Sequence, residues 1–170
     1  MKIGLIGTLA CVLGFLCAGS AGAQQKPIKD EIVGVWSLVA VTAELANGSN
    51  AEPFGANPKG IIIFTPDGHF SLFQSRGELP KIASNDRTKA SPEEAAAIVG
   101  GSIAYYGTYS VNEAEKSLAV NLDASTYANL LGGPPQKRLV TSLSATELKF
   151  ANPRTPSGMT LQTVWKRAQR

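Results

Sequence analysis

Cysteine is almost missing from this chain. Its 170 residues include only two cysteines, Cys11 and Cys17, and both lie within a segment that we expect to be removed. The rest of the chain can form neither a disulfide nor a reactive thiol, so its core must be closed by packing alone. Two domains would each be shorter than about 90 residues, a size that usually needs such cross-links. We therefore expect one domain with one core.

The sequence also lacks a large excess of either charge, and it has only one histidine. It has 16 basic and 13 acidic residues with no long basic run, so nothing predicts a surface that follows a nucleic-acid backbone. The single histidine, His69, has no second ligand at a metal-binding spacing, and strand alternation turns it outward. No catalytic triad, phosphate loop or dinucleotide fingerprint is present. The sequence predicts no catalytic residue, no metal site, no cofactor and no nucleic-acid partner.

The first 23 residues have the features of a secretory signal peptide. Lys2 precedes an apolar stretch over residues 3–18, and Ala21-Gly22-Ala23 forms an A-x-A cleavage site. A membrane anchor would need roughly twenty apolar residues, more than this glycine-interrupted stretch offers. After cleavage we expect no stable membrane insertion and a periplasmic or extracellular protein. The predicted organisation is a signal peptide (1–23), an amino-terminal arm (24–31) and one domain (32–168).

Beyond the signal peptide, short runs of β-branched and aromatic residues alternate with turn residues, which is typical of an all-β domain. Eight runs predict strands: 34–45, 60–65, 69–75, 103–111, 117–123, 137–143, 147–151 and 158–166. Eight antiparallel strands are enough to close a small barrel that holds side chains or one ligand.

A short helix interrupts the strand pattern in the connection before the fourth strand. Ser91 suits the N-cap, Pro92 the first helical position and Glu94 the capping box. Two turns of helix are unstable alone in water. We therefore expect this helix to pack across the mouth of the barrel through Ile98 and Val99.

The lengths of the connections alternate between long and short along the chain. In an up-and-down arrangement, odd connections fall at one end of the barrel and even connections at the other. The long connections and the helix therefore gather at a mouth, and the tight turns form a floor. We predict an eight-stranded up-and-down antiparallel β-barrel. A β-sandwich with Greek-key crossings has no reason to keep this alternation, although the sequence does not exclude it.

Several motifs resemble those of one known family. The opening Gly34-Val35-Trp36 resembles the first strand of the lipocalins and the wider calycin barrels. Thr65-Pro66-Asp67-Gly68, the Ser-Pro-Glu-Glu helix start, the segment from Ile103 to Tyr109, and Val164-Trp165-Lys166 are similar to the bacterial lipocalin-like domain family. This resemblance implies a calycin-type barrel with an internal cavity for small apolar molecules and no common catalytic residues. The usual disulfide cysteines of true lipocalins are missing.

Trp36 and Trp165 fall at the same end of such a barrel, where the first strand begins and the last strand finishes. We expect both rings to plug the floor. Lys166 or Arg167 is placed to lie over one ring in a cation–π contact.

Alternation along the strands also predicts the lining of the interior. On the sixth strand, Leu139, Thr141 and Leu143 are preferred over Val140. A filled core without a cavity is one reading, but Gln74 and Tyr105 near the mouth favour a ligand site. The predicted lining residues that would contact a ligand are Phe70, Leu72, Gln74, Tyr105, Tyr109, Val120, Leu139 and Thr163.

The mouth connections and the residues beside them contain 8 basic and 5 acidic side chains. Ordinary surface charge accounts for such an excess equally well. If the excess is functional, the ligand has an acidic head near Arg76 or Arg138, within reach of Gln74.

These features favour a secreted lipocalin-like protein that binds a small hydrophobic molecule inside its barrel. One alternative is a barrel enzyme, such as a cyclase or isomerase, with Tyr105, Tyr106 and Tyr109 as proton donors. Another is a secreted barrel that binds or inhibits a protein through its mouth loops or its arm. The lack of a nucleophile, base and metal site disfavours the enzyme, and the lack of disulfides disfavours the inhibitor.

Overall fold

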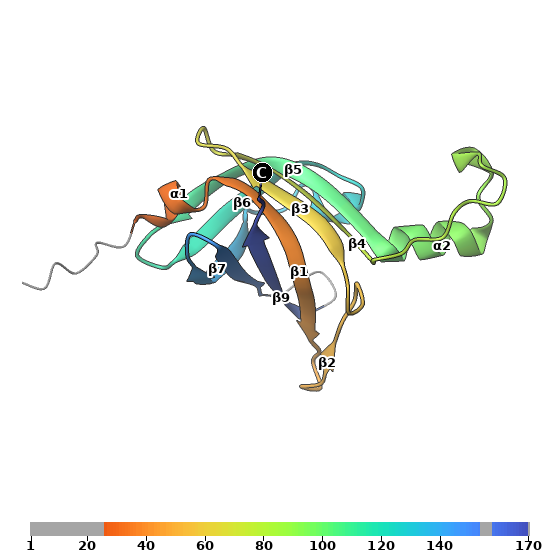
Figure 1. The fold of residues 1–170 in the computed structure, drawn as a ribbon, viewed down its shortest axis with the longest axis horizontal. Helices are drawn as coiled ribbons and strands as arrows, with labels where there is room; N and C mark the ends of the chain where they lie inside the picture. The colour runs from red at the N-terminus through yellow and green to blue at the C-terminus, as the bar shows by residue number, and fades with distance from the viewer. Residues whose placement is uncertain (1–25, 154–157, 170) are drawn as a thin grey trace, which may run out of the picture.

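The computed structural model describes residues 26–153 and 158–169, and eight of its strands form one closed antiparallel barrel (Figure 1). Each strand pairs with the next, and the first pairs with the last. The barrel strands are β1 (Gly34–Glu44), β3 (Lys59–Phe64), β4 (His69–Ser75), β5 (Ser102–Asn112), β6 (Ser117–Ser125), β7 (Gln136–Leu143), β8 (Glu147–Asn152) and β9 (Thr160–Arg167). A short ninth strand, β2 (Asn50–Ala51), pairs with the far end of β1. The predicted up-and-down barrel is confirmed, with strand limits correct to within two residues. The predicted signal peptide lies outside the described residues.

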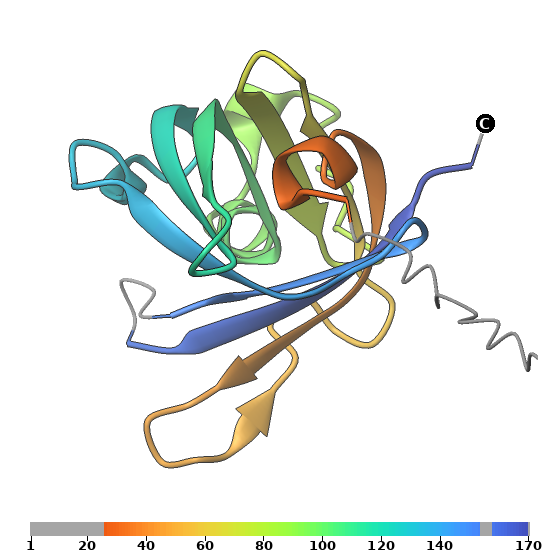
Figure 2. The same cartoon turned by 90° about the vertical axis from the view of Figure 1, so that its left-hand side faces the viewer.

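The described residues also contain four short helical segments, which lie before or between the barrel strands. They are α1 (Ile28–Glu31), η1 (Arg87–Lys89), α2 (Pro92–Gly101) and η2 (Ala128–Leu130). The predicted helix is α2, and its start has the predicted capping box, in which Ser91 and Glu94 each bind the other's backbone N–H. The predicted arm contains α1, which lies at the end of the barrel that Figure 2 faces.

The alternation of connection lengths has the predicted result. The tight turns β3–β4, β5–β6 and β7–β8 share one end of the barrel with α1, and we call this the closed end. The long connections, including α2, lie at the other end, which we call the open end (Figure 1).

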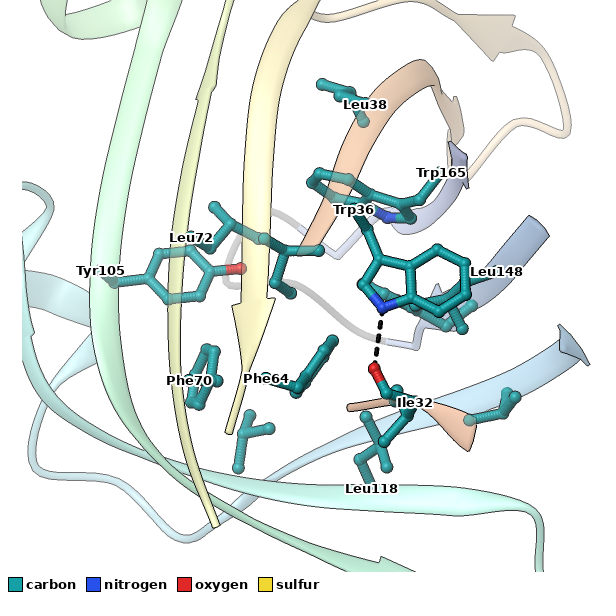
Figure 3. Close-up of a cluster of buried hydrophobic side chains, with 14 of the residues drawn as sticks. Ile32, Trp36, Leu38, Phe64, Phe70, Leu72, Tyr105, Leu118, Leu148 and Trp165 are labelled. Carbon is teal, nitrogen blue, oxygen red and sulfur yellow. Dashed lines mark hydrogen bonds between the residues drawn. The ribbon is translucent and has the colours of Figure 1, made fainter. Parts of the chain in front are cut away.

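The closed end is filled by large side chains from both ends of the domain. Ile32, Trp36, Leu148 and Trp165 have no exposed surface, and Leu118 is 1% exposed. The indole N–H of Trp36 donates to the carbonyl oxygen of Ile32 at 2.8 Å (Figure 3). Because this bond satisfies the only polar atom of the ring, Trp36 can be buried completely. The predicted plug of two tryptophans is confirmed.

Arg167 fastens the plug from outside. Its guanidinium carbon lies 3.8 Å from the centre of the Trp36 ring, and its two terminal nitrogens donate to the carbonyl oxygens of Val33 and Glu31, each at 2.7 Å. Burial lowers the pKa of Arg167, but a guanidinium stays charged at any ordinary pH. Of the two predicted cations, Arg167 therefore covers the ring, and Lys166 faces solvent.

The glycine of the Gly-x-Trp motif has a steric explanation at this point. Gly34 has φ +129°, a region that other residues rarely adopt, and a Cβ there would lie 2.7 Å from a guanidinium nitrogen of Arg167. Glycine is thus required for the arginine to reach over Trp36.

A carboxylate ties α1 to the far side of the closed end. The side chain of Glu113, in the β5–β6 turn, accepts hydrogen bonds from the backbone N–H groups of Ile28 and Lys29, both at 3.0 Å. These N–H groups belong to the first turn of α1 and have no partner within the helix. The bonds hold the arm against the base of the barrel.

Candidate functional site

Most of the predicted lining residues face the barrel interior. Phe70, Leu72 and Gln74 on β4 are 5%, 3% and 5% exposed. Tyr105, Val120 and Thr163, on three other strands, are 9% exposed or less. Alternation therefore predicted their orientation correctly, while their contact with a ligand stays a prediction.

Tyr109 faces inward but does not belong to the open half. Its hydroxyl donates to the carbonyl oxygen of Thr65 at 2.8 Å, and its ring meets Phe64 edge-on at 5.0 Å. Burial, and then the charge of Asp67, raise its pKa. This tyrosine holds the β3–β4 turn at the closed end, so its predicted place beside a ligand is not supported by its contacts.

The prediction of which β7 side chains face inward is wrong. Arg138 and Val140 are buried, at 9% and 7% exposed, whereas Leu139 is only partly buried and Thr141 is exposed. A bulge explains the difference, because the pairing with β8 shifts between Val140 and Ser142 and returns Leu143 to the core side. Leu139 thus points away from the interior, and Arg138 takes the inward position.

Arg138 and Arg76, the two arginines predicted beside the ligand, occupy different places. Arg138 is inside the barrel, with one terminal nitrogen donating to the side-chain oxygen of Gln136 at 2.8 Å. Arg76 is exposed where β4 leaves the barrel, and its side chain donates to the carbonyl oxygen of Pro53 at 3.4 Å. Only Arg138 is placed to meet a molecule in the interior.

The interior of the open half also carries a polar residue that the sequence reasoning missed. Asn152 ends β8 and is 9% exposed, and its side-chain oxygen has no hydrogen-bond partner among the described residues. The predicted strand stopped one residue earlier, at Ala151. The signal was available, because Leu148, Phe150 and Asn152 share one face of the strand by period two.

Apolar side chains surround these polar groups. Ile103 is opposite Gln74, and Leu161 is opposite Asn152 in their strand pairs. Ile103, Leu122 and Leu161 pack against the core but remain partly exposed, unlike the two tryptophans that plug the closed end. Packing is therefore tight at the base and looser toward the mouth.

The prediction that α2 docks across the mouth is wrong. Val99 is 72% exposed, and Ile98 does not join the core. The reason is continuity, since α2 ends where β5 begins and extends that strand away from the barrel (Figure 1). The preceding loop folds back onto the helix start, where the Glu94 carboxylate accepts the backbone N–H of Ala83 at 2.9 Å.

His69 lies on the outer surface, as predicted. Its side chain is 61% exposed, and its Nδ1 is 3.3 Å from a carboxylate oxygen of Asp67. The hydroxyl of Thr65 also donates to Asp67, and these two bonds, the threonine first, lower the pKa of that carboxyl. A shallow hollow of about 280 Å³ between β3, β4 and β5 includes His69 and Tyr106.

Tyr105, Tyr106 and Tyr109 do not converge on one point. Tyr105 faces the interior, Tyr106 is 53% exposed on the outside, and Tyr109 bonds to the β3–β4 turn. Three proton donors of a single active site would have to face the same reacting molecule.

Within residues 26–153 and 158–169, no three His, Cys, Asp or Glu side chains are grouped closely enough to hold a metal ion. In the same part of the chain, no helix has the length and apolar character needed to cross a bilayer.

Comparison with solved structures found similar barrels at low sequence identity. A lipocalin-like protein from Bacteroides uniformis has 14% identity and a TM-score of 0.43, with 81% of this chain and 99% of that chain covered. A redesigned β-barrel has 16% identity and a TM-score of 0.42, covering 84% of this chain and 96% of its own. A de novo designed fluorescence-activating β-barrel has 9% identity and a TM-score of 0.43, covering 85% and 100%.

A search of curated proteins found no match. A comparison with family models did find one. The family model described as a lipocalin-like domain matches residues 33–168. This match spans every strand of the barrel, from the Gly-x-Trp opening to the arginine that covers the tryptophan, and the chain belongs to the family of lipocalin-like domains.

Proposed function

We propose that this protein is exported and binds a small hydrophobic molecule, with an acidic head group, in the open half of its barrel. One observation carries the proposal. The side chains of Trp36, Leu148 and Trp165 at the closed end are fully buried, whereas Ile103, Leu122 and Leu161 in the open half keep accessible surface. A ligand of modest size would cover that surface.

The chemistry of the open half suits an amphiphile. Typical ligand sites are apolar chambers with a few placed polar groups, and each Å² of apolar surface removed from water contributes about 25 cal/mol. Ile103, Leu122 and Leu161 offer such surface to a tail. Arg138 offers a planar set of donors, which binds a carboxylate through two parallel hydrogen bonds.

Titration with a fluorescent fatty-acid analogue tests the binding. We expect saturable binding by the folded protein and its displacement by dodecanoate. Ile103→Trp, which fills the open half, should weaken binding at least tenfold, while Val99→Trp on the exposed face of α2 should not. Equal melting temperatures of the two variants would show that the loss is local. Absence of saturable binding of any apolar probe would overturn the proposal.

The acidic head is tested separately by comparing dodecanoate with dodecan-1-ol. The acid should bind more tightly, and Arg138→Gln should remove the difference. Arg76→Gln is the matched control, because that arginine is exposed and faces the Pro53 carbonyl. Equal affinities for acid and alcohol in the unmodified protein would leave a purely apolar ligand.

Export is supported by the basic start, apolar stretch and A-x-A site of the first 23 residues. Expression of the full chain followed by cell fractionation and amino-terminal sequencing tests it. The mature protein should be found outside the cytoplasm and begin at Gln24. A protein that retains Met1 in the cytoplasmic fraction would contradict it.

A further inference from the structure

Arg138 is a buried cation without an acidic partner. It is 9% exposed, and its hydrogen bonds go to the Gln136 side-chain oxygen at 2.8 Å and the Lys137 carbonyl oxygen at 3.5 Å. No ion pair within 4.0 Å links it to a carboxylate of the described residues. Its neighbour Lys137 points outward and does have one, Glu115, at 2.5 Å. A guanidinium has five donors, so several remain for an incoming group.

Arg138 has unused donors, whereas Asn152 has an unused acceptor. Its side-chain oxygen is buried and accepts no hydrogen bond, although removing such an atom from water without a partner is unfavourable. A donor that enters the barrel would satisfy this oxygen. A plain carboxylate brings none, because both of its oxygens are acceptors.

The strand register puts the two residues side by side. Leu139 pairs with Ala151, and Val140 pairs with Phe150, so the next position of this antiparallel ladder sets Arg138 opposite Asn152. Directly opposite residues on one face of a sheet have Cβ atoms about 4.5–5.5 Å apart. Arg138 also faces Leu118 of the closed end, and Asn152 faces Leu161 toward the open end, so the pair has apolar neighbours on either side and lies where the two halves meet.

Gln74 adds a third polar group from another wall. It is 5% exposed on β4, near the open end, and its amide makes no hydrogen bond among the described residues. An amide both donates and accepts. Gln74 can therefore turn toward either part of a mixed head group.

From this pair we infer that the barrel selects an amphiphile whose carboxylate stands next to a hydrogen-bond donor, as in an N-acylated amino acid or a 2-hydroxy acid. The carboxylate meets Arg138, the adjacent N–H or O–H donates to the Asn152 oxygen, and the tail lies among Ile103, Leu122 and Leu161. This inference rests on the proposed function and names its ligand class.

Calorimetric titration of the mature protein with three amphiphiles of matched length tests it: N-decanoylglycine, 2-hydroxydodecanoate and dodecanoate. We expect at least one of the first two to bind about tenfold more tightly than dodecanoate. If both do, the donor alone is selected; if only one does, the geometry of its N–H or O–H is also recognised. This ranking needs no variant.

Variants then assign the preference to its residues. Asn152→Leu should reduce the affinity for the preferred acid to that for dodecanoate and leave dodecanoate unchanged. Arg138→Gln should weaken all three acids. Asn121→Leu, an exposed change on the outer face of β6, should alter none.

The possible failures are distinguishable. Equal affinities for all three acids, or an unchanged preference in Asn152→Leu, would overturn the inference and leave the proposed function intact. Failure of every amphiphile and of the fluorescent probe to bind would overturn both.

Discussion

The two halves of this barrel satisfy their polar atoms in different ways. At the closed end, the Trp36 indole, the Arg167 guanidinium and the first N–H groups of α1 all have partners within the chain. Among the described residues of the open half, the Asn152 side-chain oxygen and the Gln74 amide have no hydrogen-bond partner, and Arg138 has no acidic partner. The closed end is complete by itself, which is the arrangement expected of a structural base. The open half leaves these groups unpaired, which is the basis of the proposed ligand site.

The strongest way to break the closed end is Trp36→Ala. Removing this fully buried ring should lower the free energy of unfolding by about 3–5 kcal/mol, a large share of the 5–15 kcal/mol typical of a domain. Urea denaturation measures the loss. Tyr106→Ala, at a ring that is 53% exposed, should change the value little. A Trp36→Ala variant that melts within a few degrees of the parent would contradict the plug.

A smaller loss is expected from Arg167→Met. Three charge-assisted hydrogen bonds, to the carbonyl oxygens of Glu31, Val33 and Ala145, disappear with the ring contact while the apolar stem is kept, and the expected loss is about 2–3 kcal/mol. Lysine at this position should not restore stability, because one ammonium lacks the planar fork that meets two carbonyls. Lys166→Met at the neighbouring exposed position is the control. Equal effects of the two methionine variants would show that the clamp contributes nothing specific.

A substitution in the open half should have the opposite effect on stability. Asn152→Leu replaces a buried oxygen without a partner, so the free energy of unfolding should stay the same or rise by about 1–3 kcal/mol. Thermal unfolding without ligand measures this change, and Asn121→Leu on the outer surface is its reference. A clear loss of stability would indicate that Asn152 has a structural partner.

The smallest expected effect concerns pH and the loop before α2. The backbone N–H of Ala83, and then that of Ser91, hold the pKa of Glu94 below its ordinary value. The contribution of this carboxylate is therefore complete above about pH 4.3, the ordinary glutamate pKa, and is lost as the pH falls through the lowered value. The protection factor of the Ala83 amide, which corrects for the intrinsic pH dependence of exchange, should fall at low pH, and Glu94→Gln should remove that fall. The amides beside Trp36 should not respond over the same range.

The sequence predicted the strands well because their boundaries are local. Turn residues such as Asp67-Gly68 and the alternating runs beside them need no distant partner to be recognised, and the connection lengths then fixed which end is closed. Gln74 was placed inside for the same reason.

The two wrong predictions, for β7 and for α2, involve interactions that no local pattern encodes. On β7 the apolar residues Leu139, Val140 and Leu143 fit either phase, and a bulge at Thr141 decided between them. The apolar residues of α2 predicted a docked helix, yet its direct continuation into β5 carries it away from the mouth. Asn152 was missed because the strand was ended one residue too early.

The seam between β1 and β9 also bears on how the barrel is made. It joins the two extremes of the domain, and the bond from Arg167 to Val33 spans 134 residues of sequence. Contacts this remote form slowly, since a long loop must close before they stabilise anything. Until β9 is in place, β1 and β8 each present an unpaired edge on which a second chain could grow. Refolding should therefore be concentration-sensitive, with the final strand as the step that separates a soluble barrel from an aggregate.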